Sequence, residues 1–270
     1  MTVDFPELET LTFELLAGDV GVLRINRPER MNSQTVRMFH EYGEAAFALR
    51  DTALRALILT AAGERAFCAG FDLDELDVIT RMGVREFLRF QETATGGIQA
   101  IRQLPFPVIA AIHGPATGGG LALALSADIR LVSPTAKFSA AFVKVGLSMG
   151  ELGTSYNLTR LVGPGRAAEI GYTGRIVGAE EAVAIGLANR VIPTAELIDE
   201  AVAMARLIAT NSPGGVRLSK RAIQRNQEIT SYAAALELEN RGQALLTRTE
   251  DMPEALAAFK EKRQPRFTGR

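Results

Sequence analysis

Two glycine-containing turns are the parts of this sequence whose residue types and spacing could do chemistry. The first lies in LILTAAGERAFCAGFDL, from Leu57 to Leu73, and the second in GPATGGGLALALSAD, from Gly114 to Asp128. Each follows a short apolar run that is typical of a buried strand, and each opens into a helical pattern. A strand-turn-helix leaves backbone N–H groups unpaired at the turn, where they can bind an anion. Two such turns could therefore direct two N–H groups at one oxygen atom.

The apolar runs and breaks around these turns predict strands that alternate with helices, followed by a helical tail, and hence an α/β fold. Strands are expected at 11–16, 20–26, 55–60, 107–112, 129–132, 137–142 and 190–192. Helices are expected at 121–127, 152–162, 166–172, 179–186, 195–210, 214–228, 231–247 and 252–262.

Two further helical segments carry specific expectations. Ser33 is the type of residue that caps a helix, which would run to Arg50 with one apolar face. The charged segment 74–104 is helical in period but is interrupted by Gly83 and by the pair Gly96-Gly97. We therefore expect a broken helical stretch there, of the kind that lines a pocket or closes over it.

Composition restricts the class of protein. Among 270 residues, Lys plus Arg number 30 and Asp plus Glu number 31, so no net charge attracts nucleic acid or a membrane surface. The single cysteine, Cys68, excludes an internal disulfide framework and is typical of a reducing compartment. The N-terminus lacks the layout of a signal peptide, and no apolar run approaches the roughly 18 residues of a membrane span. We expect a cytoplasmic protein.

Common catalytic and cofactor motifs are absent from the sequence. Gly118-Gly119-Gly120 has neither the spacing of a dinucleotide fingerprint nor that of a P-loop. No H-E-x-x-H or C-x-x-C occurs, and with two histidines and one cysteine a metal site is not expected. No G-x-S-x-G elbow supports serine hydrolase chemistry.

Several segments in a consistent order resemble the crotonase family, which is also called the enoyl-CoA hydratase/isomerase family. The resemblance is carried by ERAFCAGFDL (64–73) and AAIHGPATGGGLALALSADIRL (110–131). It extends through LRINRPERMNS (23–33), FSAAFVKVGLSMGELGTSYNLTRLVG (138–163) and TGRIVGAEEAVAIGLANRVIP (173–193). The chain is therefore identified as a member of this family over nearly its whole length.

The resemblance implies a crotonase-like spiral of strand-strand-helix turns with a C-terminal helical region. Residues 1–195 would form the acyl-CoA-binding spiral, and residues 196–270 a helical region that assembles homotrimers or dimers of trimers. The substrate would be an acyl-CoA thioester, with no metal or other cofactor. The family's oxyanion-hole donors fall on the N–H groups of Phe71 and Gly119. Removing the α-proton of a thioester places negative charge on its carbonyl oxygen, which two such donors stabilise.

The choice of reaction depends on which acidic residues face the substrate. Hydratases of the family carry two glutamates that hold a water molecule and shuttle its proton. Their positions correspond here to Ala122 and Phe142, neither of which can accept a proton. The sequence therefore departs from the hydratase pattern at both catalytic positions.

Glu151 is the carboxylate that remains, in SMGELGTSYNL. Aligned on Gly153-Thr154, it falls where peroxisomal-type Δ3,Δ2-enoyl-CoA isomerases place a single catalytic glutamate, and where dienoyl-CoA isomerases and a 4-chlorobenzoyl-CoA dehalogenase place an aspartate. Such a base can move a proton from C2 to C4 and thereby shift a double bond. The alternative is an ordinary first-turn glutamate that the helix dipole stabilises.

Other residues are expected to contact the substrate, the arginines by meeting the CoA phosphates; these are Arg27, Arg30, Ala69, Asp72, Leu73 and Phe142. Two other functions remain open. One is a 2-enoyl-CoA hydratase of the fatty-acid β-oxidation type that lacks the usual glutamate pair and uses Glu151. The other is a CoA-binding or scaffold protein that has lost catalysis. Of the remaining candidates, Cys68 is expected to be a small buried apolar residue, and Glu92 is a weaker alternative acid.

Overall fold

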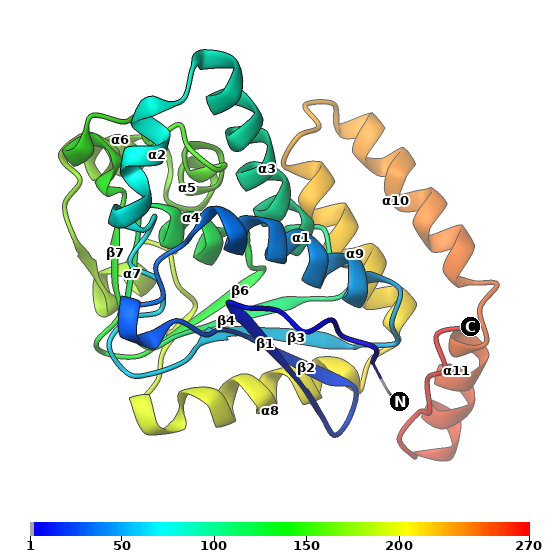
Figure 1. Cartoon of the computed structure of the whole chain (residues 1–270). Coiled ribbons are helices and arrows are strands. Elements are labelled where there is room, and N and C mark those ends of the chain that lie inside the picture. The colour runs from blue at the N-terminus through cyan, green and yellow to red at the C-terminus, as the bar shows by residue number, and fades with distance from the viewer. Residues whose placement is uncertain (1–2) are drawn as a thin grey trace.

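A six-stranded sheet leads into both glycine turns (Figure 1). The computed structural model of the chain describes residues 3–270. β1 runs antiparallel to β2, and every other pair of neighbouring strands in this sheet is parallel. In sheet order the strands are β1 (Leu11–Leu16), β2 (Val20–Ile25), β3 (Ala56–Ala61), β4 (Val108–Ile112), β6 (Ile129–Val132) and β9 (Arg190–Val191).

A second, three-stranded sheet lies beyond the ends of the large-sheet strands. Its strands are β5 (Pro115–Thr117), β7 (Lys137–Ser139) and β8 (Val177–Gly178), and Cys68 extends it through a parallel bridge to Ala116. β3 and Cys68, β4 and β5, and β6 and β7 therefore form successive turns, each of which gives one segment to each sheet. This repetition confirms the predicted spiral of strand-strand-helix turns.

Helices cover both faces of the large sheet (Figure 1). α1 and α3 lie on one face and α8 on the other, while α10 and α11 extend away from the sheet. The helices are α1 (Val36–Arg50), α2 (Leu76–Arg81), α3 (Val84–Arg102), α4 (Gly119–Ser126), α5 (Thr154–Val162), α6 (Pro164–Thr173), α7 (Ala179–Ala184), α8 (Leu197–Ala209), α9 (Pro213–Asn226), α10 (Tyr232–Leu246) and α11 (Asp251–Glu261). Short 3-10 helices are η1 (Pro28–Arg30), η2 (Leu73–Glu75), η3 (Ala141–Val145) and η4 (Thr194–Glu196).

The alternation of side chains along β3 builds two cores. Leu57 and Leu59 pack with Leu49 of α1, whereas Ile58 on the opposite face packs with Ala201 of α8. All residues of β3 are buried because both faces of the sheet are covered. The strand that precedes the first glycine turn is therefore held rigidly. Because α8 packs on this sheet, the packed layers continue past residue 195. The predicted boundary between a spiral core at 1–195 and a helical region at 196–270 stays a prediction.

Two expectations about the helices were wrong. Thr35, not Ser33, caps α1, because the Thr35 hydroxyl accepts a hydrogen bond from Met38 N–H at 3.1 Å. α3 also runs unbroken through Gly96 and Gly97. A Cβ atom at Gly97 would overlap the carbonyl oxygen of Phe39, so this glycine allows α1 and α3 to approach closely. The predicted break at Gly83 is confirmed, since it separates α2 from α3.

Two more corrections concern residues near the candidate site. β7 ends at Ser139, and Phe142 lies in η3 instead of in a strand. Glu151 precedes α5, whose N-cap is Gly153, and is therefore not a first-turn residue of that helix. The interpretation of Glu151 as a glutamate placed by the helix dipole loses its structural basis. Its position has to be explained by the turn in which it lies.

Candidate active site

Backbone hydrogen bonds hold the two glycine turns side by side. Cys68 N–H donates to the carbonyl of Pro115, and Thr117 N–H donates to the carbonyl of Cys68, both at 3.0 Å. Gly70 has a φ of +101°, and a Cβ atom there would lie 2.8 Å from the Thr117 carbonyl oxygen. The same atom would lie 3.8 Å from the nitrogen of Gly119. The two turns thus meet at Gly70 and Gly119, and only glycine permits the approach.

The N–H groups of Phe71 and Gly119 are both available at this junction. Gly70 and Asp72 pair with the backbone of Gln34, through Gln34 N–H to Gly70 O at 2.7 Å and Asp72 N–H to Gln34 O at 2.8 Å. Because alternate groups of an extended chain face opposite sides, the N–H of Phe71 between them points away from Gln34. Gly119 is the first residue of α4, so its N–H has no partner within the helix.

Both residues line one cavity of about 220 Å³. Its walls come from the two turns, from α2 and α3, and from the segment 141–152. The lining is mainly apolar, and the phenylalanines pack together, with ring centroids 6.2 Å apart for Phe39–Phe71 and 5.8 Å apart for Phe71–Phe90. Its polar side chains are Gln34, Gln91, Thr117 and Glu151.

Glu151 is the only acidic residue among the described residues that line this cavity. Burial raises the pKa of its carboxyl above the usual value, and a hydrogen bond with the Gln91 side chain opposes this effect. The next residue, Leu152, has a φ of +50°, which is strained for a non-glycine side chain. This turn places Leu152 against Gly119, since a Cβ atom at Gly119 would lie 3.5 Å from Leu152 Cδ1. Glu151 thus directly precedes a residue that packs against the second turn, and its carboxylate pairs with Gln91 of α3.

The two positions of the hydratase glutamates differ in their surroundings. Phe142 is buried and lines the cavity, as expected of a substrate-binding residue. Ala122 is fully buried in α4 and does not line it. Neither position brings a carboxylate to the cavity, which leaves Glu151 as the one carboxylate among its described lining residues.

The predicted substrate-binding residues divide into two groups. Ala69 and Leu73 line the cavity, as Phe142 does. Arg27, Arg30 and Asp72 do not; they form an ion cluster behind the first turn, with Arg27 Nη1 2.9 Å from Asp72 Oδ2 and Arg30 Nη2 3.3 Å from Asp72 Oδ1. The role of the two arginines toward CoA phosphates stays a prediction.

Asp72 is the centre of this ion cluster. Burial favours its neutral form, but hydrogen bonds from Asp74 N–H, Arg27 and Ser33 prevail and lower the pKa of Asp72 to about 2. Ser33 Oγ donates to Asp72 Oδ2 at 3.0 Å, and Asp74 N–H donates to Oδ1 at 3.1 Å. The Asp72 carboxylate, next to Phe71 in the chain, thus accepts hydrogen bonds from four donor residues. This network holds the first turn in place.

Gln34 and Gln91 line the cavity, although no pattern in the sequence predicted this. Gln34 directly follows the segment 23–33 that carried the resemblance and the predicted helix cap Ser33. Its pairing with the first turn is long-range, so no local pattern reveals it. The other candidates behave as expected or lie elsewhere. Cys68 is fully buried, which raises the pKa of its thiol to about 12, and Glu92 does not line the cavity.

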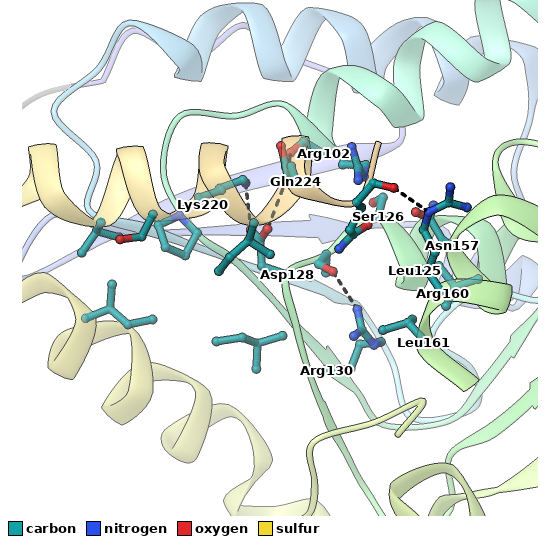
Figure 2. Close-up of a pocket in the computed structure, with 18 of the residues that line it drawn as sticks. Arg102, Leu125, Ser126, Asp128, Arg130, Asn157, Arg160, Leu161, Lys220 and Gln224 are labelled. Atoms are coloured by element: carbon teal, nitrogen blue, oxygen red, sulfur yellow. Dashed lines mark hydrogen bonds and ion pairs between the residues drawn. The ribbon is translucent and has the colours of Figure 1, made fainter. Parts of the chain in front are cut away.

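A larger cavity, of about 710 Å³, lies at the other end of α4 (Figure 2). Figure 2 shows Lys220 and Gln224 of α9 directed toward Asp128. Lys220 Nζ lies 2.8 Å from Asp128 Oδ2 and donates to Phe106 O at 2.9 Å, while Arg130 donates to two backbone carbonyls. The two contacts of Lys220 attach α9 to the segments that precede β4 and β6. The cavity shares no lining residue with the site at Phe71 and Gly119.

Neither a metal site nor a membrane span is found in residues 3–270. No group of three His, Cys, Asp or Glu side chains in this part of the chain is placed to hold a metal ion. None of its helices is both long and apolar enough to cross a membrane.

A family model described as enoyl-CoA hydratase/isomerase matches residues 17–270. The chain belongs to the enoyl-CoA hydratase/isomerase family. This member of the family is similar to the probable enoyl-CoA hydratase EchA12 of Mycobacterium tuberculosis, with 41% identity over 93% of this chain and 90% of that protein. It is also similar to the 1,2-epoxyphenylacetyl-CoA isomerase of Escherichia coli K12, with 36% identity over 93% of this chain and 95% of that protein.

The fold of this enoyl-CoA hydratase/isomerase family member is also that of solved relatives. It superposes on the crystal structure of an enoyl-CoA hydratase from Bacillus anthracis with a TM-score of 0.91 and 34% identity, covering 97% of this chain and 100% of that one. The predicted crotonase-like α/β fold is therefore confirmed. Hydratase and isomerase names both occur among the relatives, so membership of the family leaves the reaction open.

Proposed function

We propose that this chain is an acyl-CoA-processing enzyme that shifts a double bond through a thioester enolate, with Glu151 as the base. One observation carries the proposal. Glu151 is the only carboxylate, among the described cavity residues, that shares the cavity with Phe71 and Gly119. Its raised pKa makes the ionised carboxylate a stronger base than an exposed glutamate.

The proposed reaction needs only residues of this chain and the thioester. Glu151 takes a proton from C2 of a 3-enoyl-CoA, and the electron pair of that C–H bond moves into the carbonyl group, which becomes an enolate. The N–H groups of Phe71 and Gly119 stabilise the negative oxygen; removing one such donor typically costs about 10²–10³ in rate. The carboxylic acid of Glu151 then gives the proton to C4, and the double bond ends between C2 and C3.

The chemistry requires no metal or redox cofactor, because coenzyme A enters as part of the substrate. We also propose assembly as a homotrimer or a dimer of trimers. The helices at the C-terminal end support this, since they expose large apolar side chains. Tyr232, Leu245 and Phe259 on α10 and α11 are 79%, 67% and 84% exposed.

The second candidate function is hydration of a 2-enoyl-CoA. It is favoured by the name of the 41% identical relative, a probable enoyl-CoA hydratase. It is opposed by Ala122 and Phe142, which leave Glu151 without the second carboxylate that holds and activates water.

Matched 3-enoyl-CoA and 2-enoyl-CoA substrates separate these functions when conjugation and hydration are followed independently. We expect Glu151→Gln to lower isomerisation by about 10²–10⁴-fold, the usual contribution of a general base, while CoA affinity is kept. Glu92→Gln is the matched control, because this exposed residue of α3 does not line the cavity. Hydration that survives Glu151→Gln would refute the proposed role of Glu151. Binding without turnover of either substrate would instead indicate a CoA-binding or scaffold protein.

A further inference from the structure

Gln34 is a buried polar side chain in an otherwise apolar part of the cavity. It is fully buried, it lines the cavity, and its Oε1 has no hydrogen-bond partner in the part of the chain that the structure describes. A buried acceptor without a partner destabilises a folded protein, and native structures hold few of them. An unpaired acceptor of this kind therefore suggests that Gln34 has a role other than stabilising the fold.

The orientation of the Gln34 amide is set by Tyr42. Gln34 Nε2 donates to the Tyr42 hydroxyl at 3.4 Å, and that hydroxyl donates in turn to Met38 Sδ at 3.0 Å. In this chain of hydrogen bonds the Tyr42 proton goes to the thioether, and the hydroxyl oxygen accepts from the amide. The NH₂ end of Gln34 therefore faces Tyr42, and the carbonyl end faces away from it.

The carbonyl end of Gln34 lies against the second turn. A Cβ atom built on Gly119 would overlap Gln34 Oε1 and would lie 3.2 Å from Gln34 Cδ. The free acceptor thus sits beside the residue whose N–H is proposed to bind the thioester oxygen. The reacting carbons of a bound acyl group would lie next to it.

We propose that Gln34 is a specificity-determining residue, whose Oε1 accepts a hydrogen bond from an O–H group beside the reacting carbons of the acyl thioester. The proposal rests on the acyl-CoA substrate proposed above. The thioester oxygen and its enolate are themselves acceptors, so neither can pair with Oε1. An ammonium group is disfavoured because the surrounding wall is apolar and desolvating a charge is costly. The O–H group belongs either to a hydroxyl on the acyl chain or to water.

The Gln34→Met variant tests the proposal, since methionine keeps the unbranched shape and removes the acceptor. Binding of a 3-hydroxyacyl-CoA and of a saturated acyl-CoA of equal length is measured by calorimetry. Hydration of a 2-enoyl-CoA and isomerisation of a 3-enoyl-CoA are measured on the same variant. Gln99→Met is the matched control, because Gln99 is an exposed residue of α3 outside the cavity.

If the acyl chain supplies the hydroxyl, Gln34→Met lowers the preference for the 3-hydroxyacyl-CoA by about three- to tenfold, the usual worth of one hydrogen bond. If water supplies it, the ratio of hydration to isomerisation falls by about the same factor and the binding preference is kept. Tyr42→Phe, which frees the amide to rotate, is expected to shift the same ratio in the same direction. Both ratios unchanged in Gln34→Met would overturn the proposal.

Thermal unfolding distinguishes this role from a structural one. Because the unpaired acceptor is lost, we expect Gln34→Met without ligand to melt at the same temperature or about 2–4 °C higher. A lower melting temperature with unchanged ratios would make Gln34 a structural residue and overturn the proposal. Failure of every acyl-CoA to bind the unaltered protein would refute the proposed function itself, so the two failures are distinguishable.

Discussion

Replacing Asp72 by asparagine should destabilise the folded protein at the first turn, by an amount of unfolding free energy that depends on pH. The pKa of Asp72 falls from 3.8 to about 2 in the folded chain, although burial opposes the shift, because Asp74 N–H, Arg27 and Ser33 donate to the carboxylate. This lowering of the pKa of Asp72 corresponds to about 2–3 kcal/mol of folding free energy. Since the folded pKa is the lower one, this stabilisation is complete above about pH 4 and is lost as the pH falls toward 2.

The assay is urea unfolding of the unaltered protein and of Asp72→Asn between pH 2.5 and 7. We expect the unaltered protein to be more stable by about 2–3 kcal/mol at pH 6 and the difference to shrink steadily below about pH 4. Asp77→Asn is the control, because Asp77 is exposed on α2 and its ion pair with Arg81 spans 3.8 Å. A difference between Asp72→Asn and the unaltered protein that stays constant from pH 6 to pH 2.5 would refute the reasoning.

Two further predictions concern the second turn and the base. Gly120→Ala would place a Cβ atom over the carbonyl oxygen of Cys68. We therefore expect a loss of about 1–3 kcal/mol in the free energy of unfolding, measured in urea, and a lower isomerisation rate. Full isomerisation activity of this variant would contradict the close contact between the two turns. Because burial raises the pKa of Glu151, kcat/KM for isomerisation should rise with pH through an apparent pKa above 4.5, and a pH–rate profile without that step would contradict Glu151 as the base.

The sequence predicted the two turns because glycines after apolar strands are a local signal. It could not show that the turns touch, since this depends on the pairing of Cys68 with Ala116 across the small sheet. The family resemblance identified Phe71 and Gly119, and the fold brings both to one cavity. The local pattern alone would have left each as an ordinary turn residue.

Long-range contacts account for the errors near the site. The pair Gly96-Gly97 suggested a break, but Gly97 serves the close packing of α1 on α3. Arg27 and Arg30 form ion pairs with Asp72, a contact that no local pattern shows, while their role toward CoA phosphates stays a prediction. Gln34 was overlooked because its neighbours in sequence indicate a helix cap and its neighbours in space belong to other segments.

The most direct measurement of the central claim follows one proton. A 3-enoyl-CoA carrying deuterium at C2 is incubated with the unaltered protein, and the product is analysed for deuterium at C4. If Glu151 carries the proton between the two carbons, part of the label appears at C4, and Glu151→Gln abolishes both the transfer and the loss of label from C2. Label transfer that persists in Glu151→Gln would contradict the account.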